Sequence, residues 1–302
     1  MRADQLLVLR QHASSRSQAQ RLIEGGLRWR VGEVWKTVTK NGDDIPVDAE
    51  LQLQDLSEAR YVSRGGLKLE AALHQLKLSV SGWTCLDVGQ STGGFTDCLL
   101  QQGAARVVGV DVGSAQLHPS LRADPRVLCL EKLNARALDA SDLIAADQDA
   151  TGASGYFDAD PDTVAQAPFE PAFDLIVGDL SFISQTLVLP ALVPLLKPGA
   201  GLLMLVKPQF ELQPGQVGKG GIVKDDTHFP FIENRVRTAL TELGMKVTAW
   251  LDSPIAGGDG NREFFVQACW PDPAAVIPAR EATRLAHEAD LAAKAYAKAN
   301  DY

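Results

Sequence analysis

The chain has 302 residues, of which 45% are hydrophobic and 6% aromatic, enough for one sizeable core and a small appended domain. It contains no apolar run of the roughly 18 residues that a membrane span requires, and its first residues lack the profile of a secretion signal. We therefore expect a globular cytoplasmic protein that does not enter a membrane. Four cysteines, at positions 85, 98, 129 and 269, lack the paired spacing of metal ligands, so we expect buried free thiols and no metal.

The net charge of −9 comes from one segment of the chain. Residues 139–174 contain nine acids and no Lys or Arg, and the remainder is balanced. The first forty residues instead carry eight Lys or Arg against three acids. Local positive charge suits contacts with phosphate groups, which act over about one Debye length of roughly 8–10 Å. It is equally compatible with an ordinary solvated helix face.

The N-terminal residues predict a separate module. Residues 4–11 and 15–25 carry apolar side chains at helical spacing. Short antiparallel strands are predicted over residues 27–31, 33–38 and 50–53, because turn-forming residues separate them. We therefore predict a domain over residues 1–58, whose arginines could dock RNA. The candidate RNA-binding residues are Arg2, Arg16, Arg21, Arg28, Arg30 and Arg64.

A second domain begins after a connecting segment. Residues 59–81 are predicted to hold a linker and a first helix, whose apolar stripe includes Leu67, Ala72 and Leu76. Residues 82–272 then predict a Rossmann-like α/β sheet. Within it, the acidic residues 139–172 are interpreted as an insertion, mobile or partly disordered. The Ala-rich tail over residues 273–302 is expected to be a surface helix.

A glycine-rich turn marks the cofactor site of this domain. Residues 86–97 predict a buried strand, a glycine-rich turn and a helix, and residues 107–111 predict a second strand that ends in an acid. The glycine pattern is G-x-x-x-G-G rather than G-x-G-x-x-G, which favours S-adenosylmethionine (SAM) over a dinucleotide. The candidate cofactor-binding residues are Asp87, Gly89, Ser91, Gly93, Gly94, Phe95, Asp111 and Asn134.

Three of these residues have specific predicted contacts. Asp87 could bind the amino group of SAM, and Asp111 could accept hydrogen bonds from the ribose hydroxyls. Asn134 follows the predicted strand over residues 127–130, and it could reach the adenine edge or simply cap a turn.

Four charged residues are predicted to lie at the carboxyl edge of the sheet. Asp179 and Lys207 follow the strands expected over residues 173–177 and 201–206. Glu263 begins the last predicted strand, and Lys68 lies on the first helix. Each alone could be a cap or a surface charge. Their common position beside a SAM crevice favours catalysis. Burial and a second ammonium lower a lysine pKa whereas carboxylates raise it, so the sequence leaves the balance open.

Several segments resemble known families. Residues 2–7, 15–19 and 22–26 resemble the S-four-type RNA-binding domain. The order Lys68, Asp179, Lys207, Glu263 resembles the tetrad of FtsJ-type 2′-O-ribose RNA methyltransferases. The chain also resembles the TlyA family, described as rRNA methyltransferases or haemolysins; the segments that carry this resemblance are residues 61–69, 86–100, 110–117, 178–184, 207–211, 218–223 and 253–264.

The resemblance implies a function and a role for each member of the tetrad. A SAM-dependent methyl transfer to a ribose 2′-hydroxyl of ribosomal RNA is implied, with ribosomal RNA or ribosomal subunits as partners. Asp179 and Lys207 would orient and deprotonate the hydroxyl, while Lys68 and Glu263 would hold geometry and charge. No protein partner can be inferred.

Three alternatives stay open. A base-methylating RNA methyltransferase is the nearest, although such enzymes often have prolines where this chain has residues 179–182. A membrane-active haemolysin would need a membrane-interacting segment, and the sequence shows none. A non-catalytic RNA-binding protein would keep the fold only as a scaffold.

Overall fold

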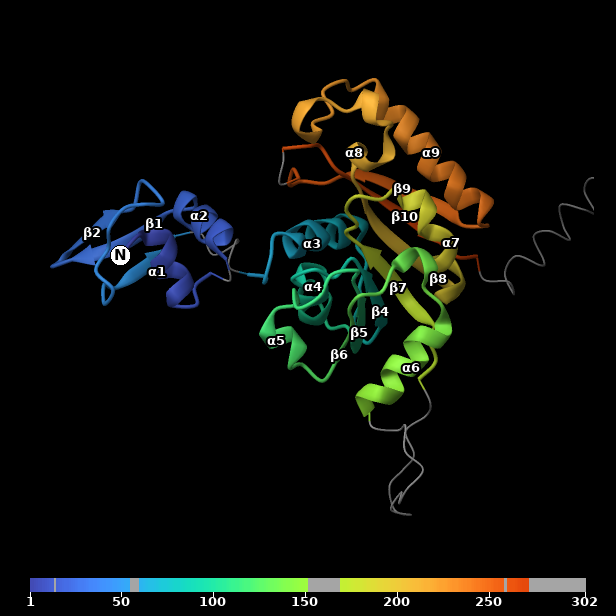
Figure 1. Cartoon of the computed structure of the whole chain (residues 1–302), viewed down its shortest axis with the longest axis horizontal. Coiled ribbons are helices and arrows are strands. Elements are labelled where there is room, and N and C mark those ends of the chain that lie inside the picture. Colours follow the sequence, from blue (N-terminus) through green and yellow to red (C-terminus); the bar gives the residue numbers. More distant parts are fainter. Residues whose placement is uncertain (14, 55–59, 152–168, 258–259, 272–302) are drawn as a thin grey trace, which may run out of the picture.

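The computed structural model describes the chain except for residues 14, 55–59, 152–168, 258–259 and 272–302. The described part contains a three-stranded sheet near the N-terminus and a seven-stranded sheet in the remainder (Figure 1). The predicted helix over residues 273–302 lies outside the described residues.

The N-terminal unit has two helices followed by three strands. They are α1 (Ala3–Leu9), α2 (Arg16–Glu24), β1 (Leu27–Val31), β2 (Val34–Thr37) and β3 (Leu51–Leu53). The sheet is antiparallel with the order β2-β1-β3, as predicted. Ser15 starts α2, because its side chain accepts a hydrogen bond from the Gln18 N–H at 3.2 Å. Leu6, Leu22 and Leu27 are fully buried between helices and sheet.

The large sheet has the strand order β6-β5-β4-β7-β8-β10-β9. Its strands are β4 (Thr84–Val88), β5 (Arg106–Val110), β6 (Val127–Leu130), β7 (Phe173–Gly178), β8 (Leu196–Val206), β9 (Lys246–Asp252) and β10 (Phe264–Cys269). The first five in spatial order are parallel, and β10 and β9 run antiparallel to their neighbours. The doubly wound α/β prediction is confirmed. The strand order reverses between β4 and β7, so the ligand crevice is expected at their carboxyl ends.

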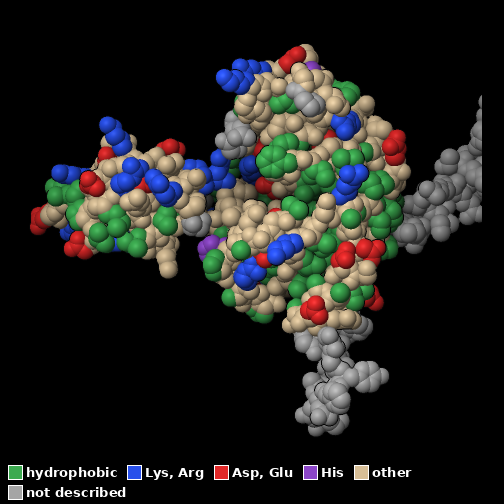
Figure 2. All heavy atoms as spheres, viewed as in Figure 1, with side chains coloured by type: hydrophobic (Ala, Val, Ile, Leu, Met, Phe, Trp, Pro, Cys, Tyr) green, Lys and Arg blue, Asp and Glu red, His purple; other side chains and the backbone are tan. Residues whose placement is uncertain are grey.

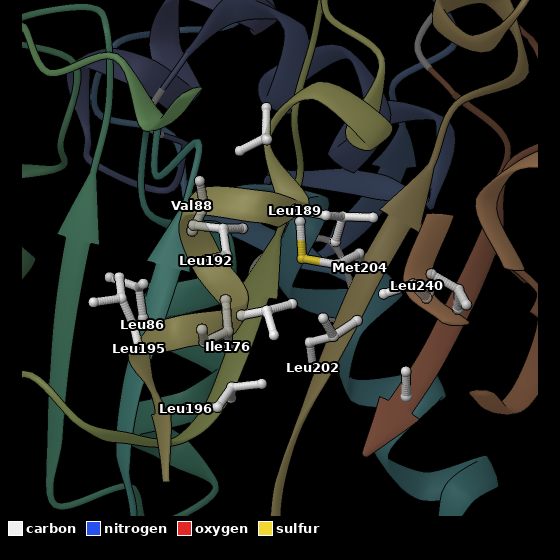
Figure 3. Close-up of a cluster of buried hydrophobic side chains, with 14 of the residues drawn as sticks. Leu86, Val88, Ile176, Leu189, Leu192, Leu195, Leu196, Leu202, Met204 and Leu240 are labelled. Carbon is white, nitrogen blue, oxygen red and sulfur yellow. The ribbon is translucent and has the colours of Figure 1, made fainter. Parts of the chain in front are cut away.

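Helices cover both faces of this sheet, which places a hydrophobic core on each side. The helices of this unit are α3 (Gly65–Leu76), α4 (Gly94–Gln101), α5 (Pro119–Arg122), α6 (Ala140–Thr151), α7 (Leu189–Leu192), α8 (Pro208–Glu211) and α9 (His228–Glu242). Helices α6, α7 and α9 pack on the face that includes Leu86 and Val88 of β4 (Figure 3). Helices α3, α4 and α5 pack on the face that includes Cys85. Because both faces are buried, the parallel strands are almost continuously apolar.

The structure corrects part of the interpretation of residues 139–172 as an insertion, since it shows residues 140–151 as a packed helix. Residues 140–151 form α6, which connects β6 to β7 as the crossover that parallel strands require. Leu143 is fully buried in the core, and Asp147 forms an ion pair with Arg106 of β5. Asp142, Asp147 and Asp149 lie on a helix with one buried side, so for these residues the acidic composition did not indicate an insertion. Residues 152–168 lie outside the described part.

Other elements were missed or only partly predicted. Helix α9 and strand β9 were not predicted, although Ile232, Val236 and Leu240 are buried at successive four-residue intervals. Cys85 and Cys98 are buried free thiols as expected, whereas Cys129 and Cys269 are only partly buried. Among the described helices, none combines the length and apolar character needed to cross a membrane.

Candidate active site

The loops after β4 and β7 form the centre of the crevice. Gly89 follows β4 with a φ of +82°, and a Cβ at this position would lie 2.9 Å from the backbone oxygen of Asp179. Only a residue without a side chain permits this close approach. The Asp179 N–H also donates to the Val88 carbonyl at 3.1 Å. Glycine at position 89 therefore brings the predicted cofactor loop and the predicted catalytic loop together.

Two adjoining cavities open at this edge of the sheet. The larger has a volume of about 510 Å³ and the smaller about 250 Å³. Both are lined by Gly89, Ser91, Asp179 and Ser181. The larger is within the roughly 300–1,000 Å³ that small-molecule sites occupy. The smaller extends from the shared residues to Lys207 and Phe95.

Asp111 and Asn134, which were predicted to bind the nucleoside of the cofactor, both line the larger cavity. The carboxylate of Asp111 accepts hydrogen bonds from the N–H groups of Ser91 and Gly113, each at 2.7 Å. These bonds fix the carboxylate at the end of β5 while leaving it partly exposed. The Asn134 side chain accepts from the Arg136 N–H at 3.0 Å. Asn134 is therefore a turn cap that also lines the cavity.

Gly93, Gly94 and Phe95 shape the start of α4. Gly93 has a φ of +94°, and a Cβ there would lie 2.4 Å from the side chain of Leu121. A Cβ on Gly94 would lie 2.2 Å from the hydroxyl of Ser63. Gly94 and the buried Phe95 line the smaller cavity. Gly94 and Phe95 thus form part of the crevice wall, whereas Gly93 lines neither cavity and packs against Leu121.

Asp87 lines neither cavity, and its predicted direct contact with the cofactor stays a prediction. Its side chain is fully buried, and one carboxylate oxygen accepts a hydrogen bond from the Thr96 hydroxyl at 2.7 Å. Thr96 in turn accepts from the Gln90 side-chain amide at 2.9 Å. Burial raises the pKa of Asp87 to about 7. In the structure, Asp87 is linked through Thr96 to Gln90 of the predicted cofactor loop.

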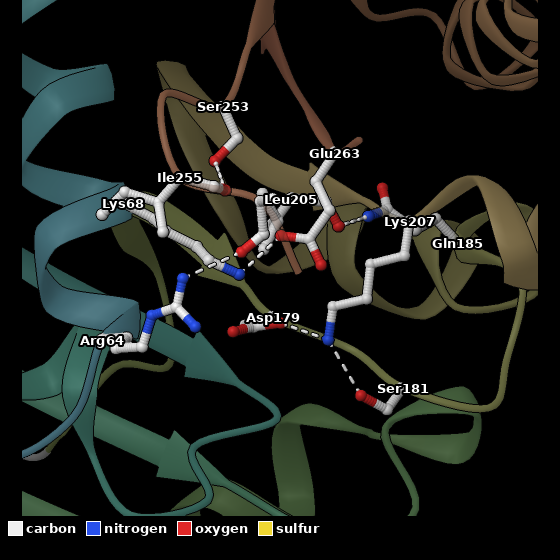
Figure 4. Close-up of polar contacts among 11 residues, drawn as sticks. Arg64, Lys68, Asp179, Ser181, Gln185, Leu205, Lys207, Ser253, Ile255 and Glu263 are labelled. Carbon is white, nitrogen blue, oxygen red and sulfur yellow. Dashed lines mark hydrogen bonds and ion pairs between the residues drawn. The ribbon is translucent and has the colours of Figure 1, made fainter. Parts of the chain in front are cut away.

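The four predicted catalytic residues come together as two ion pairs. Lys207 Nζ lies 2.6 Å from Asp179 Oδ1, and it also donates to the Ser181 hydroxyl at 2.9 Å. Lys68 Nζ lies 2.5 Å from Glu263 Oε2. The Lys68 and Glu263 side chains are only 8% and 2% exposed. Figure 4 shows Lys68 entering from α3, with the amino group of Lys207 directed at Asp179 and Ser181. The site thus has one buried pair and one pair that borders the cavities.

Arg64 belongs to the active-site region rather than to the N-terminal unit. It immediately precedes α3, and its guanidinium donates to the Ala256 carbonyl at 3.1 Å. Figure 4 shows it beside Lys68. Its contact with RNA stays a prediction, and any such contact would be made beside Lys68.

The other candidate RNA-binding arginines lie on the N-terminal unit, where several have internal partners. Arg2 and Arg16 both form ion pairs with the buried Asp4, at 3.0 and 2.8 Å. The hydrogen bond from Arg2 contributes most to holding the pKa of Asp4 well below its usual range. Arg30 pairs with Glu50 at 3.1 Å, and both side chains are exposed. Arg2 and Arg16 therefore stabilise this unit, whatever they contribute to RNA binding.

Arg21 and Arg28 complete this group. Arg21 lies on α2 and is partly buried, and Arg28 lies on β1 with its guanidinium beside the side-chain amide of Gln54. Figure 2 shows Lys and Arg side chains on the N-terminal unit and on the adjoining part of the larger unit. This distribution agrees with the positive charge that the sequence assigned to the first forty residues.

The sequence did not single out Phe182, which lines the larger cavity. Its side chain is 91% exposed although it is aromatic, and its φ is +64°. Its ring lies 5.2 Å from that of Phe210, between centroids. A left-handed backbone at phenylalanine is unusual, so no sequence pattern would have predicted that this ring faces solvent at the cavity.

No group of three or more His, Cys, Asp or Glu side chains that could hold a metal is found within the described ranges. The polar groups at the two cavities are instead backbone amides, hydroxyls, carboxylates and ammonium groups. This donor set suits an organic ligand with an amino acid and a ribose.

The chain is similar to characterised and structurally determined proteins. A family model described as FtsJ-like methyltransferase matches residues 61–269. Over 271 residues the chain is 40% identical to 16S/23S rRNA (cytidine-2′-O)-methyltransferase TlyA of Mycobacterium tuberculosis, covering 88% of each protein. It is 35% identical to Hemolysin A of Brachyspira hyodysenteriae, covering 87% of this chain and 98% of that one.

A solved structure from Streptococcus thermophilus, which carries a provisional hemolysin name, is also similar. It has a TM-score of 0.64 and 35% identity, covering 90% of this chain and 89% of that one. The similarity therefore extends over the N-terminal unit and the large sheet.

Proposed function

This chain belongs to the FtsJ-like methyltransferase family, and we propose from that premise that it transfers a methyl group from SAM to a ribose 2′-hydroxyl of ribosomal RNA. The observation that carries the proposal is the meeting of Asp179 and Lys207, 2.6 Å apart, at the junction of the two cavities. The ribose specificity is supported by the name of the Mycobacterium tuberculosis relative.

The larger cavity fits the nucleoside of SAM. Asp111 would bind the ribose hydroxyls, and Asn134 and Leu133 would lie beside the adenine. The Gly89 position, which lines both cavities and excludes a Cβ, would let the cofactor lie close to the backbone. When bound, SAM supplies an electrophilic methyl group on a positively charged sulfur.

We assign the Asp179–Lys207 pair to the acceptor side. Methyl transfer requires the 2′-oxygen to attack the methyl carbon in line with the leaving sulfur while its proton departs. The pair offers an ammonium group to hold the oxygen and a carboxylate to receive the proton. The buried Lys68–Glu263 pair would fix the charge and geometry behind them.

The N-terminal unit would dock the RNA. Paired RNA exposes its 2′-hydroxyls in a shallow groove and is recognised largely through shape and phosphate contacts. Arg21, Arg28 and Arg30 could supply such contacts, with Arg64 closer to the target ribose. Ribosomal RNA or ribosomal subunits would be the partners, and such a substrate would place the enzyme in the cytoplasm.

The proposal is tested by transfer of labelled methyl from SAM to purified ribosomal subunits that lack the modification. The RNA is then digested and its nucleosides are identified by mass spectrometry. A 2′-O-methylated nucleoside, absent with Lys207→Ala, is the expected product. A methylated base would favour the base-methylating alternative and overturn the proposal.

Two further outcomes would also overturn it. Binding of ribosomal RNA without methyl transfer to either subunit or to precursor particles would favour a non-catalytic role. Release of dye from liposomes without SAM would favour the haemolysin interpretation.

A further inference from the structure

The loops that carry Asp179 and Lys207 are joined by a buried carboxylate. Glu211 is the last residue of α8, the one-turn helix that follows Lys207. Its side chain is 1% exposed. Oε2 accepts a hydrogen bond from the Ser184 hydroxyl at 2.5 Å, and Oε1 accepts from the Gln185 N–H at 2.8 Å. Ser184 and Gln185 belong to the loop that follows Asp179, so one side chain connects both loops.

Two other contacts join the same loops. The side-chain amide of Gln185 donates to the Leu205 carbonyl, two residues before Lys207 on β8. Phe182 from the Asp179 loop also packs against Phe210 of α8. Lys207 thus lies between two hydrogen-bonded connections to the neighbouring loop, at Leu205 and at Glu211. These connections hold the backbone on both sides of Lys207 to the loop that carries Asp179.

The connection depends on a buried carboxylate, that of Glu211. A carboxylate buried to this extent is unfavourable unless its oxygens are hydrogen-bonded, and here both are. Its interactions are with a hydroxyl and a backbone N–H rather than with substrate. Arg235 of α9 donates to the backbone carbonyl of Glu211, which fixes the end of α8 against the helix layer.

We propose that Glu211 is a positioning residue for methyl transfer, which sets the distance between Asp179 and Lys207 by clamping their loops. The inference rests on the proposed function and adds a residue to it. Glu211 does not line either cavity, so it acts through the two loops rather than on substrate. A displacement of about 1 Å in a reacting group can reduce the rate about 100-fold.

The test compares Glu211→Ala, Glu211→Gln and Ser184→Ala in the full chain. With Glu211→Ala we expect kcat to fall about 100-fold, with the SAM Kd and the RNA KM within about threefold of wild type. Glu211→Gln should recover most of kcat, because its amide oxygen can accept from Gln185 and its NH2 can donate to Ser184. Ser184→Ala removes one of the two bonds to the Glu211 carboxylate, together with the Ser184 contacts to Thr186, and should give an intermediate loss.

The matched control is Glu233→Ala on α9, where a partly exposed glutamate pairs with Arg237 at 2.7 Å. It removes the same chemical group and should leave kcat unchanged. Wild-type kcat in folded Glu211→Ala would overturn the inference. A parallel loss of SAM affinity would do so as well, because it would indicate general damage to the crevice.

A second measurement does not depend on methyl transfer. Lys207 is labelled with an amine-reactive reagent and its labelling rate is followed by mass spectrometry. Loosening of the clamp should increase the rate several-fold in Glu211→Ala and little in Glu211→Gln. If Lys207 is labelled at the same rate in Glu211→Ala and in Glu211→Gln, the inference is overturned. If wild type transfers no methyl group but the labelling rates differ as expected, the proposed function fails while the positioning role stands.

Discussion

Lys68 Nζ and Glu263 Oε2 lie 2.5 Å apart although the two residues are separated by 195 positions in the chain. Lys68 comes from α3, which packs on one face of the sheet, and Glu263 precedes the antiparallel strand β10. The pair is buried, so each charge has lost most of its contact with water and is stabilised by the opposite charge of its partner. It therefore connects the start of the catalytic unit to its last strand, directly behind the Asp179–Lys207 pair.

Breaking this buried pair should destabilise the fold. Glu263→Gln leaves the Lys68 ammonium buried without its partner, and we expect a loss of about 3–5 kcal/mol in the free energy of unfolding. The double variant Lys68→Met/Glu263→Gln should recover much of that loss while staying inactive. Urea denaturation measures the stability, and the labelled-methyl assay measures activity. A double variant as unstable as the single one would contradict this account.

Removal of the Lys207 side chain should abolish turnover. Lys207→Ala takes away the ammonium on the acceptor side but none of the predicted nucleoside contacts, so the SAM Kd should stay within a few-fold of wild type. Calorimetry measures binding, and methyl incorporation measures turnover. Lys197→Ala is the control, since Lys197 also pairs with an aspartate, Asp174, at 2.9 Å, but at a different cavity. Loss of SAM binding in a folded Lys207→Ala would refute the assignment.

Asp87 should make stability depend on pH. Its native pKa of about 7 exceeds the ordinary 3.8, so the native state binds more protons between these values. Protonated Asp87 contributes its full share to the free energy of unfolding below about pH 4. This contribution is lost as the pH rises towards about 7. Asp87→Asn has no carboxyl group at this position, so its free energy of unfolding should not show this decrease. The difference in free energy of unfolding between the variant and wild type should therefore change in favour of the variant by roughly 2–3 kcal/mol between pH 5 and pH 8. Urea unfolding of both proteins across this range is the measurement, and parallel curves would contradict the raised pKa.

Phe182 should contribute to substrate binding through stacking. Its exposed ring lines the larger cavity and packs against Phe210 of α8, the helix that follows Lys207, and stacking of a base on an aromatic side chain contributes about 1–3 kcal/mol. Phe182→Ala should therefore weaken RNA binding about 5- to 150-fold, which corresponds to that energy. Phe182→Trp should retain binding. RNA titrations of both variants provide the measurement, and equal affinity of Phe182→Ala and wild type would exclude stacking.

The arginines of the N-terminal sheet should determine the salt dependence of RNA binding. If Arg28 and Arg30 each contact one phosphate, the double alanine variant should lower the slope of log K against log salt by about 1.5–2. Arg126→Ala, at an exposed pair with Asp124 in the large unit, is the control. Filter binding at several salt concentrations measures the slope. An unchanged slope would remove these two arginines from the RNA interface.

The sequence by itself determined the features that depend on neighbouring residues. The strand, glycine turn and helix over residues 86–97 follow from local backbone freedom and apolar spacing, and the structure contains all three. The same applies to the antiparallel strands of the N-terminal unit and to the charged residues that follow β7 and β8. The residues of helix α6 were interpreted as an insertion because the segment around them is acidic and lacks Lys and Arg. The buried side of the helix around Leu143 is too narrow to stand out in the sequence.

Only the tertiary structure decided how the distant charges combine. The contacts of Lys68 with Glu263 and of Lys207 with Asp179 depend on strand order and on which helix covers which face, and no local pattern determines these. The sequence also could not place Asp87 beneath the cofactor loop or Glu211 between two loops. Burial and hydrogen bonding of a side chain are set by residues far away in the chain, so local patterns identify the charged groups but not their partners.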